Sequence, residues 1–280
     1  MGLNLIFYIF VFLLGLAVGS FLNCVIYRLE KNESFLKGRS YCPHCKHILG
    51  WQDLIPVLSF FILRGKCRYC GKRISWQYPL VEIATGLLFL LIFNFKFLIS
   101  KQFLIFNFLN LFYHWVIASF LIIIFVYDLK YYIIPDKIIY PAIALTFLYQ
   151  FFHSLEFENW NLFRIWNLEF GILKPLLSAF LASIFFLIIV LFSKGKWMGG
   201  GDIKVAFFMG LFLGFPKILV ALFSAYLIGA IIGIGLILAG KKTLKSEVPF
   251  GPFLVTGTFI TLFFGNQIIN LYLNFFNLTI

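Results

Sequence analysis

The chain has few charged residues, and acidic residues are especially scarce. Its 280 residues include only 11 Asp and Glu, and charged residues make up 12% of the chain, against 62% hydrophobic residues. A soluble globular domain is about a quarter charged. This composition, with a mean hydropathy of +0.97, excludes an ordinary soluble domain and indicates a polytopic membrane protein. Each acid beside an apolar segment therefore needs an explanation as an anchor, a helix cap or a catalytic group.

The sequence also lacks Ser/Gly linkers, low-complexity tracts and internal repeats, and its only substantial polar segment is 24–78. A helix needs roughly 20 mostly apolar residues to cross a bilayer. The fold class that we expect is an all-α polytopic membrane protein of about eight transmembrane helices with a small cytoplasmic loop domain. The expected spans are 4–23, 79–95, 104–127, 137–153, 172–193, 203–215, 217–239 and 251–275.

Basic residues are unevenly distributed along the chain. Of the 23 Lys and Arg, 18 fall in the segments 24–78, 128–137, 194–204 and 240–250. The other five are Lys96, Lys101, Arg164, Lys174 and Lys217. An excess of Lys and Arg marks cytoplasmic loops. We therefore expect an inner-membrane protein whose main polar loop faces the cytoplasm, and the net charge of +12 does not require a nucleic-acid partner.

Three parts follow from this organisation: a first transmembrane helix at 1–23, a cytoplasmic cysteine domain at 24–78, and a multi-helix membrane domain at 79–280. The cysteine domain carries two CxxC pairs 21 residues apart, formed by Cys42, Cys45, Cys67 and Cys70. Two such pairs can surround a tetrahedral zinc ion, and a four-Cys site is structural because it leaves no open position. We predict structural zinc here, since disulfides are rare in a reducing compartment.

Three other residues near these cysteines could take part. His44 and His47 could replace a thiolate as ligands, although we interpret both as solvated loop residues. Cys24 follows the first span directly, and we interpret it as a small packing residue.

Three aspartates lie at expected span edges. Asp128 follows the run SFLIIIFVY, Asp136 follows IIP, and Asp202 follows three glycines in WMGGGDIK. An even number of expected spans separates Asp128 from Asp202, so both must lie at the same membrane face. Asp136 and Asp202 could be helix caps. Asp128 ends its span, where the helix dipole disfavours an anion, so it is the harder of the three to explain structurally.

Two neighbouring carboxylates cannot easily both ionise, so such a pair shares a proton. One member can then activate water while the other polarises a carbonyl group. This is the chemistry of an aspartic protease. Gly199 and Gly201 beside Asp202 lack a Cβ and would let substrate or a neighbouring helix come close.

These residues resemble the type IV prepilin peptidases, the membrane aspartic proteases with a G-x-G-D motif. Five segments carry the resemblance in order: GLAVGSFLNCVIYRLE (15–30), the cysteine segment (39–86), DLKYYIIPD (128–136), GGGDIK (199–204) and VPFGPFL (248–254). G-x-G-D alone is a weak motif, but five ordered segments are specific.

The resemblance implies Asp128 and Asp202 as the catalytic pair, with Gly199, Gly201, Asp136 and Lys204 in support. Asp136 remains an alternative partner for Asp202. The implied reaction is cleavage of the short basic leader of prepilins and pseudopilins at the cytoplasmic membrane face.

The resemblance also implies N-methylation of the new N-terminus with S-adenosylmethionine, since the long cytoplasmic loop is present. No residues are assigned to methyl transfer beyond Glu82, which could equally be a helix N-terminal acid. The alternative functions are a transporter that uses edge carboxylates as a proton or cation relay and a membrane assembly factor.

Overall fold

A computed structural model describes residues 2–35, 37–98, 104–154, 165–195, 198–243 and 246–275. The described chain is helical, and its only β contacts are two isolated bridges, Tyr41–Ile48 and Lys66–Arg73. Its elements are α1 (Gly2–Glu30), η1 (Trp51–Asp53), α2 (Leu58–Ile62), α3 (Gln77–Ile92), the π-helical turn η2 (Phe93–Leu98), α4 (Leu104–Tyr131), α5 (Asp136–Ser154), α6 (Ile165–Ser193), α7 (Gly200–Leu213), α8 (Lys217–Leu238) and α9 (Gly251–Phe275).

The chain forms two compact units, Met1–Ile123 and Ile124–Ile280, and α4 contributes to both. We call them unit 1 and unit 2. The functional division at residues 24 and 79 stays a prediction, since it separates segments by role rather than by packing.

In unit 1, α1 and α3 pack closely because glycines line their contact. A Cβ on Gly15 would lie 2.7 Å from the Cα of Gly86, and a Cβ on Gly19 would lie 2.7 Å from the Cα of Glu82. Small residues let two membrane helices approach closely and gain packing contacts where no hydrophobic effect drives association. The GLAVG segment thus fixes the distance between α1 and the start of α3.

The loop after α1 is held by one buried arginine. Arg28 is 4% exposed and donates to the backbone carbonyls of Ser34, Lys37 and Arg39 at 3.0, 2.8 and 2.9 Å. A buried guanidinium needs such partners to offset its lost hydration. The expected first span ends at residue 23, but the helix continues to Glu30 and places Arg28 where it can organise the cysteine domain.

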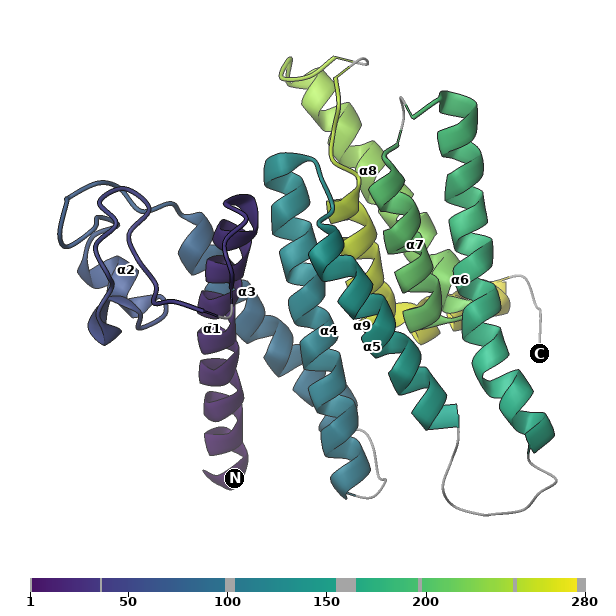
Figure 1. Cartoon of the computed structure of the whole chain (residues 1–280). Coiled ribbons are helices and arrows are strands. Elements are labelled where there is room, and N and C mark those ends of the chain that lie inside the picture. Colours follow the sequence, from purple (N-terminus) through teal and green to yellow (C-terminus); the bar gives the residue numbers. More distant parts are fainter. Residues whose placement is uncertain are drawn as a thin grey trace. The chain divides into compact units, whose positions relative to one another are not determined.

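In unit 2, the C-terminal ends of α4, α6 and α8 and the N-terminal ends of α7 and α9 lie at one end (Figure 1). Asp128 is in the last turn of α4, and Asp202 is in the first turn of α7. Both carboxylates therefore lie toward the same end of the unit, as the even number of intervening spans predicts.

Glycine again permits the close helix pairs of unit 2. A Cβ on Gly210 of α7 would lie 2.5 Å from the Cα of Ala179 in α6, and a Cβ on Gly257 of α9 would overlap the carbonyl oxygen of Ala221 in α8. These pairs hold the helices that carry the site at fixed separations.

Each of the eight expected spans overlaps a helix, although 203–215 extends beyond the end of α7 at Leu213 and 79–95 extends from α3 into η2. Within the described residues, six helices are long and apolar enough to cross a membrane, namely α1, α3, α4, α6, α8 and α9. The chain is therefore a multi-pass membrane protein. The remaining two, α5 and α7, do not meet that criterion, so the count of about eight spans is not confirmed. Lys101, Arg164 and Trp197 lie outside the described residues.

Candidate active site

Asp128 is buried at the end of α4, with 5% of its surface exposed. Its Oδ2 accepts a hydrogen bond from the backbone N–H of Gly251 at 3.0 Å. A carboxylate at a helix C-terminus faces the negative end of the dipole, so an N–H donor from another helix start offsets an unfavourable position. The bond joins the end of α4 to the first residue of α9.

Gly251 was assigned no role from the sequence, although it lies in the segment VPFGPFL. A Cβ at this position would lie 2.6 Å from Asp128 Oδ2 and 3.1 Å from its Cγ. Real Cβ atoms do not approach so closely, so only glycine fits against the carboxylate. The resemblance of 248–254 to a family segment was the one signal that could have pointed to it.

Asp202 is 6% exposed and lies at the third position of α7. Its Oδ2 accepts the N–H of Gly199 at 3.2 Å, while its own N–H donates to the carbonyl of Gly199 at 3.2 Å. Gly199 is the N-cap residue, with extended backbone (φ −83°, ψ 158°). The carboxylate is thus fixed by the glycine segment that precedes it.

The two carboxylates interact. Asp202 precedes the expected span 203–215. Burial raises the pKa of Asp202 to about 7, and the negative charge of Asp128 adds to this effect, while the hydrogen bond from Gly199 opposes it. Such a pair holds one proton near neutral pH, which leaves one acid and one base in the same site. This arrangement can perform general acid and base catalysis on water and a carbonyl group.

Asp136 has a different environment. Its Oδ1 pairs with Lys204 Nζ at 2.5 Å, and the two side chains are 58% and 32% exposed. The Lys204 ammonium also lies 5.1 Å from the centre of the Tyr140 ring. Asp136 and Lys204 therefore connect α5 to α7 near the surface, and the charge that acts on Asp202 is that of Asp128.

The two glycines expected to support the site differ in their surroundings. A Cβ on Gly201 would lie 3.0 Å from the Cβ of Ile134, so this glycine lets the segment before α5 pack against α7. Apart from its two chain neighbours, the described residues place one atom within 4 Å of a Cβ on Gly199, the backbone nitrogen of Gly201 at 3.9 Å. Gly199 therefore serves as the N-cap of α7.

The four cysteines of unit 1 converge. Their sulfur atoms all lie within 4.8 Å of one another. The two CxxC turns have the same backbone: the N–H of Cys42 donates to the carbonyl of His47 at 2.9 Å, and the N–H of Cys67 donates to that of Lys72 at 2.8 Å. Each turn has a left-handed residue four positions after its first cysteine, Lys46 (φ 60°) and Gly71 (φ 69°).

This sulfur cluster fits a tetrahedral metal ion. Zn–S bonds of about 2.3 Å place sulfurs about 3.8 Å apart in a tetrahedron, close to the 4.0 Å between Cys42 and Cys70. Burial opposes ionisation of Cys42, but hydrogen bonds from the backbone of Cys45 and His44 lower the pKa of its thiol to about 7. Cys24, His44 and His47 are outside the cluster, and the His47 ring packs on Tyr69 at 3.6 Å between centres.

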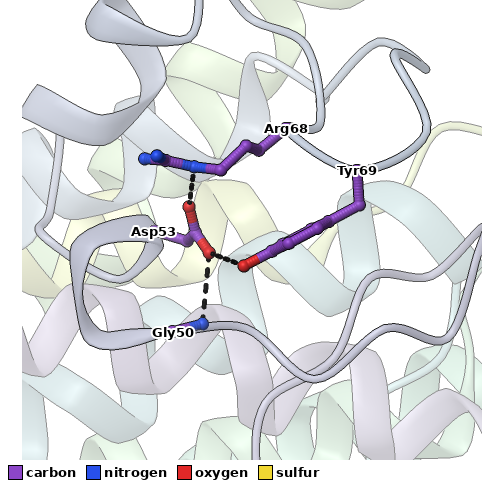
Figure 2. A network of polar contacts seen from close by, with 4 residues as sticks. All are labelled: Gly50, Asp53, Arg68 and Tyr69. Carbon is purple, nitrogen blue, oxygen red and sulfur yellow. Dashed lines mark hydrogen bonds and ion pairs between the residues drawn. The ribbon is translucent and has the colours of Figure 1, made fainter.

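Asp53 connects the WQD turn to the second cysteine turn (Figure 2). Its carboxylate accepts the Nε–H of Arg68 at 2.8 Å, the hydroxyl of Tyr69 at 3.0 Å and the N–H of Gly50 at 3.1 Å. Despite burial, which opposes ionisation, the bonds from Tyr69, Gly50 and Arg68 lower the pKa of Asp53. No pattern in the sequence marked this residue.

Glu82 is the sixth residue of α3 and is 6% exposed. Helix-dipole stabilisation fades beyond the first turn, so the reading as a helix N-terminal acid is not supported. Its Oε2 accepts the N–H of Val57 at 2.7 Å. Val57 has φ 62°, which is unusual for a β-branched residue, so Glu82 holds a strained turn. It also lines a cavity of about 120 Å³ with Asn23 and Tyr27.

Comparison with protein families gives two matches along the chain. The model of the type IV leader peptidase family matches residues 115–234, and that of the bacterial peptidase A24 N-terminal domain matches residues 13–95. The first range contains Asp128 and Asp202, and the second contains all five cysteines.

Several curated proteins named "Prepilin leader peptidase/N-methyltransferase" are similar over most of their length. The Bacillus subtilis protein is 33% identical over 262 residues, which cover 94% of this chain and 96% of the relative. The Myxococcus xanthus protein is 33% identical over 86% of this chain and 67% of its own. The Legionella pneumophila protein is 32% identical over 96% and 95%. No solved structure matches the chain.

Proposed function

Since the chain belongs to the type IV leader peptidase family, we propose that it cleaves the leader peptide of prepilins and pseudopilins, with Asp128 and Asp202 as the catalytic pair. The observation that supports the assignment most directly is that both carboxylates are buried toward the same end of unit 2, where the charge of Asp128 contributes to the raised pKa of Asp202. Asp136, in its exposed pair with Lys204, supports the connection of α5 to α7.

The reaction uses the single shared proton. Asp128 is ionised and removes a proton from water, whose oxygen attacks the scissile carbonyl carbon. Asp202 donates its proton to the carbonyl oxygen, which gives a tetrahedral diol. The diol collapses and returns a proton to Asp202 as the C–N bond breaks, while Asp128 protonates the leaving amine. The pair then again holds one proton.

The distribution of charge supports the membrane orientation in this proposal. The connections at the active-site end of unit 2 include the basic segments 128–137, 194–204 and 240–250. The positive-inside rule supports a cytoplasmic location for that end in the inner membrane. A prepilin whose apolar segment stays in the lipid would then present its leader junction to Asp128 and Asp202.

In this proposal the chain also N-methylates the new N-terminus, and the N-methyltransferase part of its relatives' names supports a methyl-transfer activity. S-adenosylmethionine would supply the methyl group. The cavity beside Glu82, about 120 Å³, is smaller than the roughly 300–1,000 Å³ of sites that enclose a ligand of this size. It does not fit the whole cofactor in this conformation, so no methyl-transfer step is assigned to its residues.

Cys42, Cys45, Cys67 and Cys70 hold a structural zinc ion in this proposal. The four converging sulfurs and the two equivalent CxxC turns support it. A closed four-thiolate site has no open coordination position, so the ion stabilises unit 1 rather than taking part in peptide cleavage.

A transporter would use its carboxylates near the bilayer midplane. Asp128 and Asp202 lie at helix ends, and the family of the chain is a peptidase family, so this alternative has no observation in its favour.

The test of the proposed function is incubation of the detergent-purified protein with a full-length prepilin, with and without S-adenosylmethionine. The mass and N-terminal sequence of the product are read directly. We expect loss of the leader in both reactions and one added methyl group only with the cofactor. An intact substrate in both reactions, with several prepilins tried, would refute the assignment.

A further inference from the structure

Tyr226 in α8 has a buried hydroxyl with no hydrogen-bond partner among the described residues. Buried polar groups are nearly always paired, and an unpaired one calls for an explanation such as a ligand or a catalytic role. Nothing in the sequence singled out this tyrosine, because it lies inside the apolar run of α8.

The ring of Tyr226 is fixed by aromatic neighbours from two other helices or their connections. It packs on Phe250 with 5.1 Å between ring centres and on Phe186 with 6.3 Å at an angle of 26°. Phe186 is fully buried in α6. A ring packed against two other aromatic rings loses little further freedom when its hydroxyl binds a ligand.

This ring lies next to the site through two independent connections. Phe250 directly precedes Gly251, whose N–H binds Asp128 at 3.0 Å. The carboxylate of Asp202 acts electrostatically on the Tyr226 hydroxyl, although no hydrogen bond joins them. The unpaired donor therefore belongs to a ring that contacts the residue before Gly251, and it makes no hydrogen bond to either carboxylate among the described residues.

Resting on the function proposed above, we propose that Tyr226 is a third catalytic residue, whose hydroxyl donates a hydrogen bond to the oxygen of the scissile carbonyl. That oxygen gains charge as water attacks, and a donor already in place stabilises the transition state without reorganising. The hydroxyl has no partner in the free enzyme and acquires one when substrate is bound. No proton leaves the tyrosine, because Asp202 supplies the proton of the diol.

The test is Tyr226→Phe, which removes the hydroxyl and keeps the ring on Phe250 and Phe186. We expect kcat for prepilin cleavage to fall about 10²- to 10³-fold, as for loss of one oxyanion donor, with KM little changed. Because the hydroxyl has no partner, the unfolding temperature should not fall. Methylation of an already cleaved pilin should continue at the wild-type rate.

The matched control is Tyr272→Phe, which removes the hydroxyl of an exposed residue in α9 of the same unit and should cleave like wild type. A Tyr226→Phe variant as fast as wild type would overturn the role of Tyr226 while leaving the peptidase assignment intact. A variant that loses cleavage, methylation and thermal stability together would also overturn this role, because such a loss is a structural effect. A shifted pH profile with an unchanged maximal rate would overturn it as well, because the hydroxyl would then act on Asp202 rather than on the substrate. If wild type itself cleaves no prepilin, both proposals fail.

Discussion

Gly251 and Asp128 are 123 residues apart in the chain, and the N–H of the first donates to the carboxylate of the second at 3.0 Å. The bond brings the first turn of α9 to the last turn of α4. This hydrogen bond takes the place of one that water would donate to the carboxylate if Asp128 were exposed. The position of Asp128 thus depends on a residue that has no side chain of its own.

Replacement of Gly251 by alanine should therefore impair cleavage. The new Cβ would lie 2.6 Å from Asp128 Oδ2, so the carboxylate or the start of α9 must move. A displacement of about 1 Å can lower the rate about 10²-fold. The measurement is kcat for prepilin cleavage. Gly233→Ala in α8, where nothing lies within 4 Å of the added Cβ, should cleave normally, and equal rates for both variants would contradict the packing argument.

Cleavage should fall as the pH rises through the pKa of Asp202. Burial and the charge of Asp128 raise that pKa to about 7, and the mechanism needs the proton on Asp202. Below this pH the pair keeps its proton, and above it both carboxylates are ionised and the acid is lost. The pH profile of kcat should show a descending limb near 7, which Asp136→Asn should leave in place. A rate that stays constant through this range would contradict the shared proton.

Loss of zinc should destabilise unit 1. Cys42→Ser removes one of the four converging sulfurs, and structural zinc contributes directly to folding free energy. We expect the purified variant to lose its zinc, measured by elemental analysis, and to unfold at a lower temperature. Cys24→Ser changes a cysteine outside the cluster and should keep a full zinc content. Wild-type protein that is stable and free of zinc would remove the structural role.

Gly210→Ala should lower stability through overpacking. The added Cβ would lie 2.5 Å from the Cα of Ala179 and 2.6 Å from the carbonyl of Ser178. Both are backbone atoms, so α6 and α7 must separate, at a cost of about 1–3 kcal/mol. Thermal unfolding in detergent measures the change. Gly235→Ala in α8, which has open space, should be as stable as wild type or more so, and an equal loss in both would argue against close packing of α6 and α7.

The helices could be predicted well because hydropathy sets them. The expected span 251–275 coincides with α9, and 217–239 differs from α8 by one residue. The ends of α1 and α4 were placed too early, at 23 and 127 rather than Glu30 and Tyr131. Both helices continue beyond their apolar runs, where buried polar residues such as Arg28 find partners that hydropathy does not register.

The site could be predicted only in part. Asp202 has a local signal, the glycines before it, and Asp128 is an acid at the wrong end of a helix dipole. The other features have no local signal. Gly251 binds Asp128 and Asp53 binds Arg68, each across an intervening stretch of chain, and the Tyr226 hydroxyl has no hydrogen-bond partner among the described residues. Such contacts exist only once the helices pack, so the order of residues alone does not indicate them.

The central claim is that Asp128 and Asp202 together cleave the substrate. Its most direct test is the single-turnover rate of prepilin cleavage by Asp128→Asn, Asp202→Asn and Asp136→Asn, each purified with its zinc and with an unchanged unfolding profile. The account predicts no measurable cleavage for the first two and substantial cleavage for the third. Substantial cleavage by either of the first two variants, or loss of cleavage only in Asp136→Asn, would contradict it.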